Sequence, residues 1–126
     1  ANIFEGKVIS SKGGKLTVST DVGEVFASNG RSITEGEKIW LGLRPEKIYL
    51  SKAKPKNIGP NQIKGIVEEI GYLGETSIYK IRLKNGQIID VSAPNQSRPM
   101  SRVREITWED MVYLNWEPES VMLLTS

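Results

Sequence analysis

Hydrophobic and polar residues alternate along most of the chain with a period of two. The apolar positions of the clearest segments are Phe4 and Val8, Leu16 and Val18, Ile39, Leu41 and Leu43, and Tyr79, Ile81 and Leu83. Successive side chains of a β-strand point to opposite faces of a sheet, so each of these segments has one apolar face. The alternation predicts an all-β fold built from short strands.

Turn residues separate the alternating segments, most clearly at Asn85-Gly86. We expect a hairpin with a type I′ turn there, because that turn requires positive φ at both central residues, and Asn-Gly tolerates it. Helical patterns are confined to two short stretches, residues 32–38 and 101–111.

Two octapeptides far apart in the chain share one design, "LRPEKIYL" at residues 43–50 and "WEPESVML" at residues 116–123. The residues that precede the two octapeptides also match each other, at the same offset of 73 residues. A second set of matches, at an offset of 59 residues, aligns Phe4, Gly6 and Val8 with Ile63, Gly65 and Val67. The sequence therefore predicts an internal duplication.

The duplication divides the chain into a first lobe at residues 1–51, a connector at 52–62 and a second lobe at 63–126. Each copy has room for about five short strands, which fits a small Greek-key barrel of the oligonucleotide/oligosaccharide-binding (OB) type. An open sandwich is the competing architecture. A lobe of about sixty residues is marginally stable alone, so we expect the lobes to share strands as one compact unit. The predicted fold class is all-β, with tandem OB-like small barrels and short helical insertions.

The composition excludes most hydrolase designs. The 126 residues include no Cys and no His, which removes disulfides, thiolate nucleophiles, imidazole chemistry and the usual zinc ligand sets. A net charge of +2 does not demand a nucleic-acid partner. No apolar run is long enough to span a membrane, and the first residues lack the pattern of a signal peptide, so we expect a cytoplasmic protein.

The dipeptides Pro45-Glu46 and Pro118-Glu119 have two interpretations. As a catalytic pair, the two carboxylates would need environments that separate their pKa values, whereas duplicated positions should have similar surroundings. As structural corners, they exploit the fixed φ of proline between two strands. The duplication favours the structural corners.

The stretch "GYLGET" at residues 71–76 also has two interpretations, which are compatible. Its glycines, Gly71 and Gly74, suit a bulge or bend of the strand. Its apolar residues, Tyr72 and Leu73, suit an exposed contact for a partner.

Two basic clusters require a choice between solvated loops and a nucleic-acid site. Their members are Lys52, Lys54 and Lys56 in the connector and Arg98, Arg102 and Arg104 in the second lobe. Small barrels bind single strands through aromatic platforms in basic grooves, but the aromatic residues here occupy positions of core character. We interpret the clusters as solvated loops, and a free-standing single-stranded nucleic-acid-binding protein is the alternative.

Five short stretches, in this order, give the chain a family resemblance. They are "NIFEG" at residues 2–6, "LRPE" at 43–46, "YLGET" at 72–76, "APN" at 93–95 and "WEPE" at 116–119. The chain resembles the C-terminal transport-associated OB (TOBE) domain of ATP-binding subunits of bacterial ABC importers, of the polyamine (spermidine/putrescine) or ferric-iron type. It departs from that pattern at Glu109, where we expect a glycine.

The resemblance implies a non-catalytic regulatory and dimerisation domain. The Walker motifs, the signature sequence and the switch histidine of the family have no counterpart here, so ATP and Mg would bind to an ATPase domain that is missing from this chain. The implied partners are that N-terminal ATPase domain in cis, a second copy of the subunit in a homodimer and, indirectly, the membrane permease subunits. We expect no nucleic acid.

The resemblance further implies a peripheral location on the inner face of the bacterial cell membrane. Related single barrels bind oxyanions, so a small oxyanion sensor is another alternative. We expect no catalytic, cofactor-binding or metal-binding residues. The residues singled out as interface or structural motifs are Arg44, Pro45, Glu46, Tyr72, Leu73, Pro118 and Glu119.

Overall fold

The computed structural model describes residues 1–28, 32–56, 59–94 and 106–124. Within these ranges the chain forms strands and two short 3₁₀ turns, η1 and η2. In chain order the elements are β1 (Asn2–Lys12), β2 (Lys15–Thr20), β3 (Gly23–Ala27), β4 (Lys38–Leu43), η1 (Pro45–Lys47), β5 (Tyr49–Ser51), β6 (Asn61–Leu73), β7 (Thr76–Arg82), β8 (Ile88–Pro94), β9 (Met111–Trp116), η2 (Pro118–Ser120) and β10 (Val121–Leu124).

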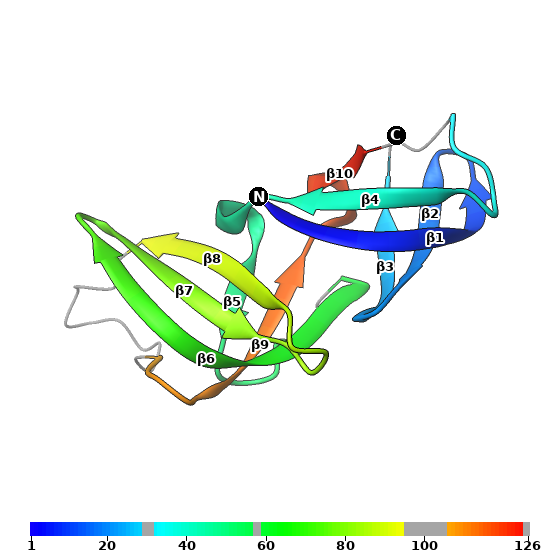
Figure 1. Ribbon diagram of the computed structural model, residues 1–126. Coiled ribbons are helices and arrows are strands. Elements are labelled where there is room, and N and C mark those ends of the chain that lie inside the picture. Colours follow the sequence, from blue (N-terminus) through cyan, green and yellow to red (C-terminus); the bar gives the residue numbers. More distant parts are fainter. Residues whose placement is uncertain (29–31, 57–58, 95–105, 125–126) are drawn as a thin grey trace.

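The strands build two antiparallel sheets of five strands each (Figure 1). The first sheet has the order β10-β4-β1-β2-β3, and the second has the order β5-β9-β6-β7-β8. The edge strands of each sheet contact each other, so each sheet curls into a small barrel. We call these barrels the first and second lobes. The predicted all-β, OB-like architecture is confirmed.

Each lobe receives one strand from the other half of the sequence. β5 follows β4 along the chain but pairs with β9 in the second lobe, where Leu50 lies opposite Leu114. β10 follows β9 but pairs with β4 in the first lobe, where Leu123 lies opposite Leu41. The last strand of each sequence copy therefore completes the sheet of the other lobe.

A single hydrophobic core runs through both lobes. The period-two pattern of the sequence is the burial pattern of the strands, as in β1, where Phe4 and Val8 are buried between exposed neighbours. The ring of Phe4 stacks on that of Trp116 from β9, with centroids 6.4 Å apart and planes 11° from parallel. This aromatic pair joins the cores of the two lobes.

Two glycines at equivalent positions of the repeat allow close approach of neighbouring strands. A Cβ atom on Gly6 would lie 2.5 Å from Cγ1 of Val18, and one on Gly65 would overlap Cγ2 of Ile81. Both distances are too short for non-bonded carbon atoms, so the first strand of each lobe packs on the second only because it has no side chain there.

The helix predicted at residues 32–38 is wrong, because the segment forms a turn that leads into β4. The carboxylate of Glu37 accepts a hydrogen bond from the backbone N–H of Thr34, a contact that also begins helices. Gly36, however, has a φ of 95°, which ends the turn at once.

The equivalent turn of the second lobe precedes β9, and residues 106–110 are likewise not helical. The backbone N–H of Thr107 donates to the carboxylate of Asp110 at 2.8 Å, and Glu109 has a φ of 67°. Glu109 therefore takes the left-handed conformation that Gly36 takes in the first lobe. Residues 101–105 of the second predicted helix lie outside the described residues.

The hairpin predicted at Asn85-Gly86 joins β7 and β8, but its turn is not of type I′. Only Gly86 has positive φ, at 90°, whereas the Asn85 side chain accepts a hydrogen bond from the backbone N–H of Gln87 at 3.0 Å. Leu83 and Gln87 close a three-residue loop in which glycine alone needs the left-handed conformation.

Candidate functional site

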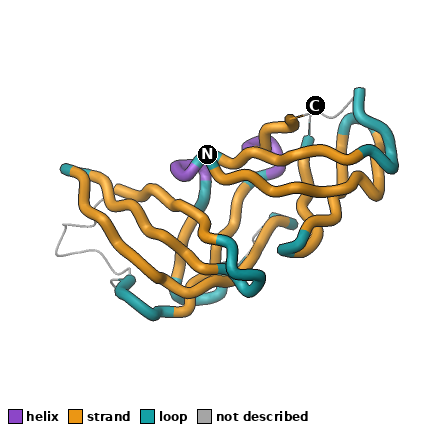
Figure 2. The backbone as a smooth tube through the Cα atoms, in the orientation of Figure 1, coloured by secondary structure: helices purple, strands orange, loops and turns teal. Residues whose placement is uncertain are grey.

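The two Pro-Glu corners lie where the chain passes from one lobe to the other. η1 connects β4 of the first lobe to β5 of the second, and η2 connects β9 of the second lobe to β10 of the first. Figure 2 shows both turns at the junction of the lobes. Pro45 and Pro118 each occupy the first position of a 3₁₀ turn, where the fixed φ of proline fits and its missing N–H is no loss.

The charged residues of these corners point to solvent. Arg44, Glu46 and Glu119 are exposed, while the two prolines are half-buried. η1 packs against β8 and η2 against β3, and the backbone N–H of Ser28 donates to the carbonyl of Pro118 at 3.4 Å. Each corner thus covers an edge strand of the lobe that the chain is entering.

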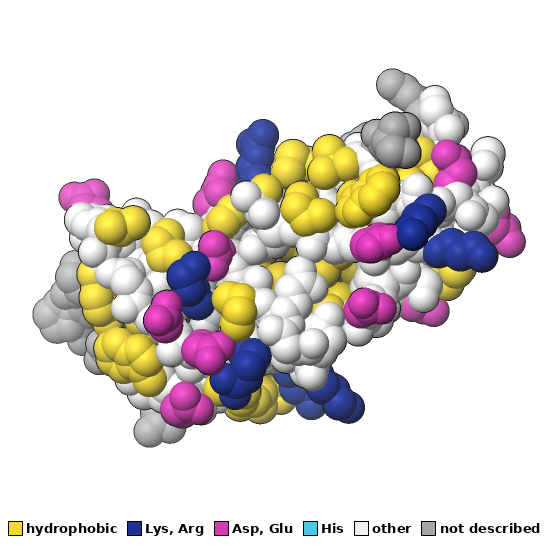
Figure 3. Space-filling model, in the orientation of Figure 1, with side chains coloured by type: hydrophobic (Ala, Val, Ile, Leu, Met, Phe, Trp, Pro, Cys, Tyr) yellow, Lys and Arg dark blue, Asp and Glu magenta, His cyan; other side chains and the backbone are white. Residues whose placement is uncertain are grey.

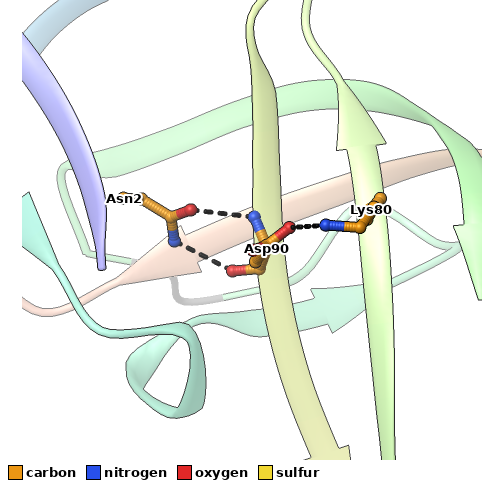
Figure 4. Close-up of polar contacts among 3 residues, drawn as sticks. All are labelled: Asn2, Lys80 and Asp90. Carbon is orange, nitrogen blue, oxygen red and sulfur yellow. Dashed lines mark hydrogen bonds and ion pairs between the residues drawn. The ribbon is translucent and has the colours of Figure 1, made fainter. Parts of the chain in front are cut away.

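Two buried asparagines, which the sequence analysis did not single out, bind the lobes together at the same junction. Asn2 begins β1, and its side chain bonds both backbone polar groups of Asp90 in β8 (Figure 4). The N–H of Asp90 donates to Oδ1 of Asn2 at 2.8 Å, and Nδ2 of Asn2 donates to the carbonyl of Asp90 at 2.9 Å. Asn2 is 7% exposed.

Asn61 makes the equivalent contact in the opposite direction. It begins β6, and its amide bonds both backbone groups of Phe26 in β3, at 2.8 Å to the N–H and 2.9 Å to the carbonyl. β3 and β8 are edge strands, so each amide satisfies backbone groups that have no strand partner on that side. The repeat held a signal for this pair, because asparagine occupies the same position in both copies.

The β6–β7 hairpin carries Tyr72 and Leu73 at its tip, where the two residues are 59% and 68% exposed. The predicted bulge of this strand lies at a different place, between Val67 and Glu69. Gly74, with a φ of 62°, forms the tight turn instead. The structure separates these two apolar residues from the corners, so the predicted site residues form no single cluster.

A second apolar surface lies on the outer face of the first sheet. Ile3 and Leu124 are each 42% exposed, and half-buried Trp40 lies between their strands on β4. Figure 3 shows hydrophobic side chains gathered over this part of β1, β4 and β10. We call Ile3, Trp40, Met122 and Leu124 the outer apolar face.

Three exposed ion pairs link charged side chains on neighbouring strands. Lys38 contacts Glu5 at 2.7 Å, and this hydrogen bond, with the attraction of the carboxylate, raises the pKa of Lys38. Across the second sheet Lys80 pairs with Asp90, and Arg82 with Glu68. Within the described ranges no three Asp or Glu side chains form a group that could hold a metal ion.

The sequence matches known proteins over nearly its whole length. The sequence model of a family described as the TOBE domain matches residues 41–124. The putrescine transport ATP-binding protein PotG of Escherichia coli (strain K12) is 35% identical over 126 residues, which are 98% of this chain and 33% of that protein. The spermidine/putrescine import ATP-binding protein PotA of Chromobacterium violaceum is 31% identical over 114 residues, 85% of this chain and 32% of that protein. The chain thus spans about a third of the length of these curated relatives.

The fold also matches a solved structure. The cytoplasmic molybdate-binding protein ModG, with molybdate bound, superposes with a TM-score of 0.84 over 99% of this chain and 96% of its own. The two sequences are 14% identical, so this likeness establishes the fold alone. Within the described ranges no helix has the length and apolar character required to traverse a lipid bilayer.

Proposed function

The chain belongs to the TOBE domain family, and from this premise we propose that it is the non-catalytic regulatory and dimerisation domain of the ATP-binding subunit of a bacterial ABC importer. The alignment with PotG carries the proposal, because it covers 98% of this chain but only a third of that protein. The remaining two thirds have room for an ATPase domain in cis, which would bind ATP and Mg.

The proposed cargo of the importer is a polyamine, putrescine or spermidine. The names of the relatives support this choice, as PotG is a putrescine transport protein and PotA a spermidine/putrescine import protein. The subunit would work as a homodimer at the inner face of the cell membrane, where the ATPase domains contact the permease subunits. No catalytic residue is assigned to the TOBE domain.

We assign the domain's contacts with other parts of the transporter to its exposed apolar surfaces. The outer apolar face lies on three neighbouring strands of one sheet, and apolar groups gathered in this way mark interaction sites more often than isolated ones do. The hairpin tip, with Tyr72 and Leu73, is a second contact, directed at a partner subunit.

The two corners differ in charge, and this difference gives them different proposed roles. Arg44 precedes the first Pro-Glu and Glu117 precedes the second, both exposed. The Arg44 corner would face the partner and the Glu117 corner would face solvent, while the two prolines and Glu46 and Glu119 keep a structural role. If Arg44→Glu in the full-length subunit changed neither dimerisation nor ATPase activity, this assignment would be wrong.

The full-length subunit tests the proposal. We expect it to hydrolyse ATP, to dimerise, and to restore putrescine uptake when expressed with its permease in a strain that lacks its own putrescine importer. Removal of residues 1–126 should abolish regulation of ATP hydrolysis but leave a basal rate. The isolated 126-residue chain should hydrolyse no ATP.

Two results would contradict the proposal. ATP hydrolysis by the purified 126-residue chain would exclude a non-catalytic domain. Binding of single-stranded DNA or RNA at micromolar concentration, weakened steeply by salt, would favour the nucleic-acid alternative.

A further inference from the structure

A cleft of about 460 Å³ lies between the two lobes. Its lining comes from the β2–β3 turn of the first lobe and from the start of β6 and the β7–β8 turn of the second lobe. Apolar groups of Val22, Ile63 and Leu83 line its walls. This volume is within the range of clefts that bind small molecules.

Three lysines, Lys54, Lys64 and Lys84, also line the cleft. In the part of the chain that the structure describes, none of them has a carboxylate within ion-pair distance, although Lys52, Lys80 and Arg82 are paired. Asp21 is the acidic residue of the lining. The three ammonium groups outnumber this carboxylate, so the cleft is electropositive and would gain from a bound anion.

The duplicated fold provides an internal comparison for this charge. Gly6 and Gly65 are equivalent, so the preceding residues Glu5 and Lys64 are equivalent as well. Val8 lies opposite Val18 and Val67 lies opposite Ile81, so by the same count Asp21, after β2, corresponds to Lys84, after β7. The first lobe thus carries acids where the second carries lysines, and the fold itself does not require positive charge at these positions.

Two further groups of the lining suit a ligand that is not a bare inorganic ion. The ammonium of Lys64 lies 5.9 Å from the centre of the Tyr113 ring, close to the limit for a cation–π contact. Nε2 of Gln62 is buried and has no hydrogen-bond partner among the described residues. The cleft therefore combines cations, an aromatic ring and apolar walls, and Gln62 lies beside them in its lining.

We propose that this cleft binds a small aromatic anion, in which a phosphate or carboxylate group contacts Lys54, Lys64 and Lys84 and a planar ring lies against Tyr113 and the apolar walls. The proposal goes beyond the proposed function and does not depend on it, since it concerns the isolated domain and no transport step.

The 126-residue chain can be titrated with phenyl phosphate, benzoate, inorganic phosphate and benzylamine, by calorimetry and by ¹H–¹⁵N NMR. We expect phenyl phosphate or benzoate to bind at least about tenfold more tightly than inorganic phosphate, because the ring adds buried apolar area. The side-chain amide signal of Gln62 should shift. Benzylamine, with the same ring and the opposite charge, should not bind.

Variants place the binding at the cleft. Lys64→Glu and Lys84→Asp, which introduce the residue types of the first lobe, should each weaken phenyl phosphate binding about tenfold or more. Lys54→Gln, outside the strands, should weaken it without risk to the fold. The control is Lys15→Glu on β2, an exposed lysine outside the cleft, which should bind as the original chain does.

Three results would overturn the proposal. The first is an unshifted Gln62 amide signal at about 10 mM phenyl phosphate, a concentration at which millimolar binding would be visible. The second is a loss of binding in Lys15→Glu as large as in the cleft variants, which would indicate general charge attraction. The third is equal affinity for inorganic phosphate and phenyl phosphate. Loss of transport by the full-length subunit would bear on the proposed function alone.

Discussion

Asn61 in the second lobe bonds both backbone polar groups of Phe26 in the first, and it is 1% exposed. The amide replaces a neighbouring strand at the edge of the first sheet. Since Asn2 makes the same contact in the reverse direction, the two lobes are joined by a reciprocal pair of hydrogen-bonded side chains.

Asn61→Ala should lower the free energy of unfolding by about 2–4 kcal/mol, because it leaves an N–H and a carbonyl of Phe26 without partners. Urea denaturation followed by circular dichroism measures this loss. Asn115→Ala is the matched control: Asn115 is half-buried on the outer face of β9, and the change should cost less than about 0.5 kcal/mol. Equal effects of the two substitutions would show that the lobes do not depend on the amide.

Gly65→Ala should destabilise the chain by about 1–3 kcal/mol, because the added methyl overlaps Ile81 in the packed second lobe. Gly71→Ala is the control in the same strand, where a Cβ would meet no heavy atom within 4 Å. That change should be neutral or slightly stabilising, since alanine restricts the unfolded chain. A comparison of the two melting temperatures decides the matter, and a neutral Gly65→Ala would contradict the packing argument.

Glu109→Gly should raise the free energy of unfolding by about 1 kcal/mol, because residue 109 has a φ of 67° and glycine adopts it without the clash of a Cβ atom. The backbone hydrogen bond from Glu109 to the carbonyl of Val67, at 2.8 Å, is retained. Glu109→Ala keeps the Cβ atom and should gain nothing. If glycine and alanine gave the same stability, strain at this turn would be absent.

Trp116→Phe should cost less than about 1.5 kcal/mol, whereas Trp116→Ala should cost about 3–5 kcal/mol. Phenylalanine keeps a ring against Phe4 and removes the indole N–H, which has no hydrogen-bond partner among the described residues. Circular dichroism suits both variants, since it does not rely on the altered fluorophore. Similar losses in the two variants would indicate that the indole nitrogen makes a stabilising bond.

The sequence allowed prediction of the strands and the duplication because period-two burial is a local property. Phe4, Val8 and Leu41 occupy the core positions that the alternation assigns. The prediction of a helix at residues 32–38 was wrong because Thr34 and Glu37 make the same hydrogen bond in a turn as at a helix start. Only the positive φ of Gly36 distinguishes the turn from a helix. The predicted type I′ turn was wrong because Leu83 and Gln87 close a loop of three residues, in which Asn85 keeps a negative φ and its side chain accepts a hydrogen bond from the N–H of Gln87.

The arrangement of the lobes was harder to predict from the sequence, since it depends on contacts between residues far apart in the chain. Neither the pairing of Leu123 with Leu41 nor that of Leu50 with Leu114 can be read from an alternating pattern, which fits any sheet. Lys64 and Lys84 were also missed, because single lysines in strands and turns are ordinary until the fold brings them to one cleft. The Pro-Glu corners were predictable as structural elements, but not as the crossings between lobes.

The exchange of β5 and β10 also has a consequence for the order in which the protein is made. Strands β1–β4 are synthesised before the second lobe, yet the β4 edge of their sheet stays open until residues 121–124 have been synthesised. Contacts that close between residues so distant in sequence form late and slow the folding of β proteins. Translation that pauses before residue 121 would therefore leave a nascent first lobe whose unpaired β4 edge is open to pairing with another chain.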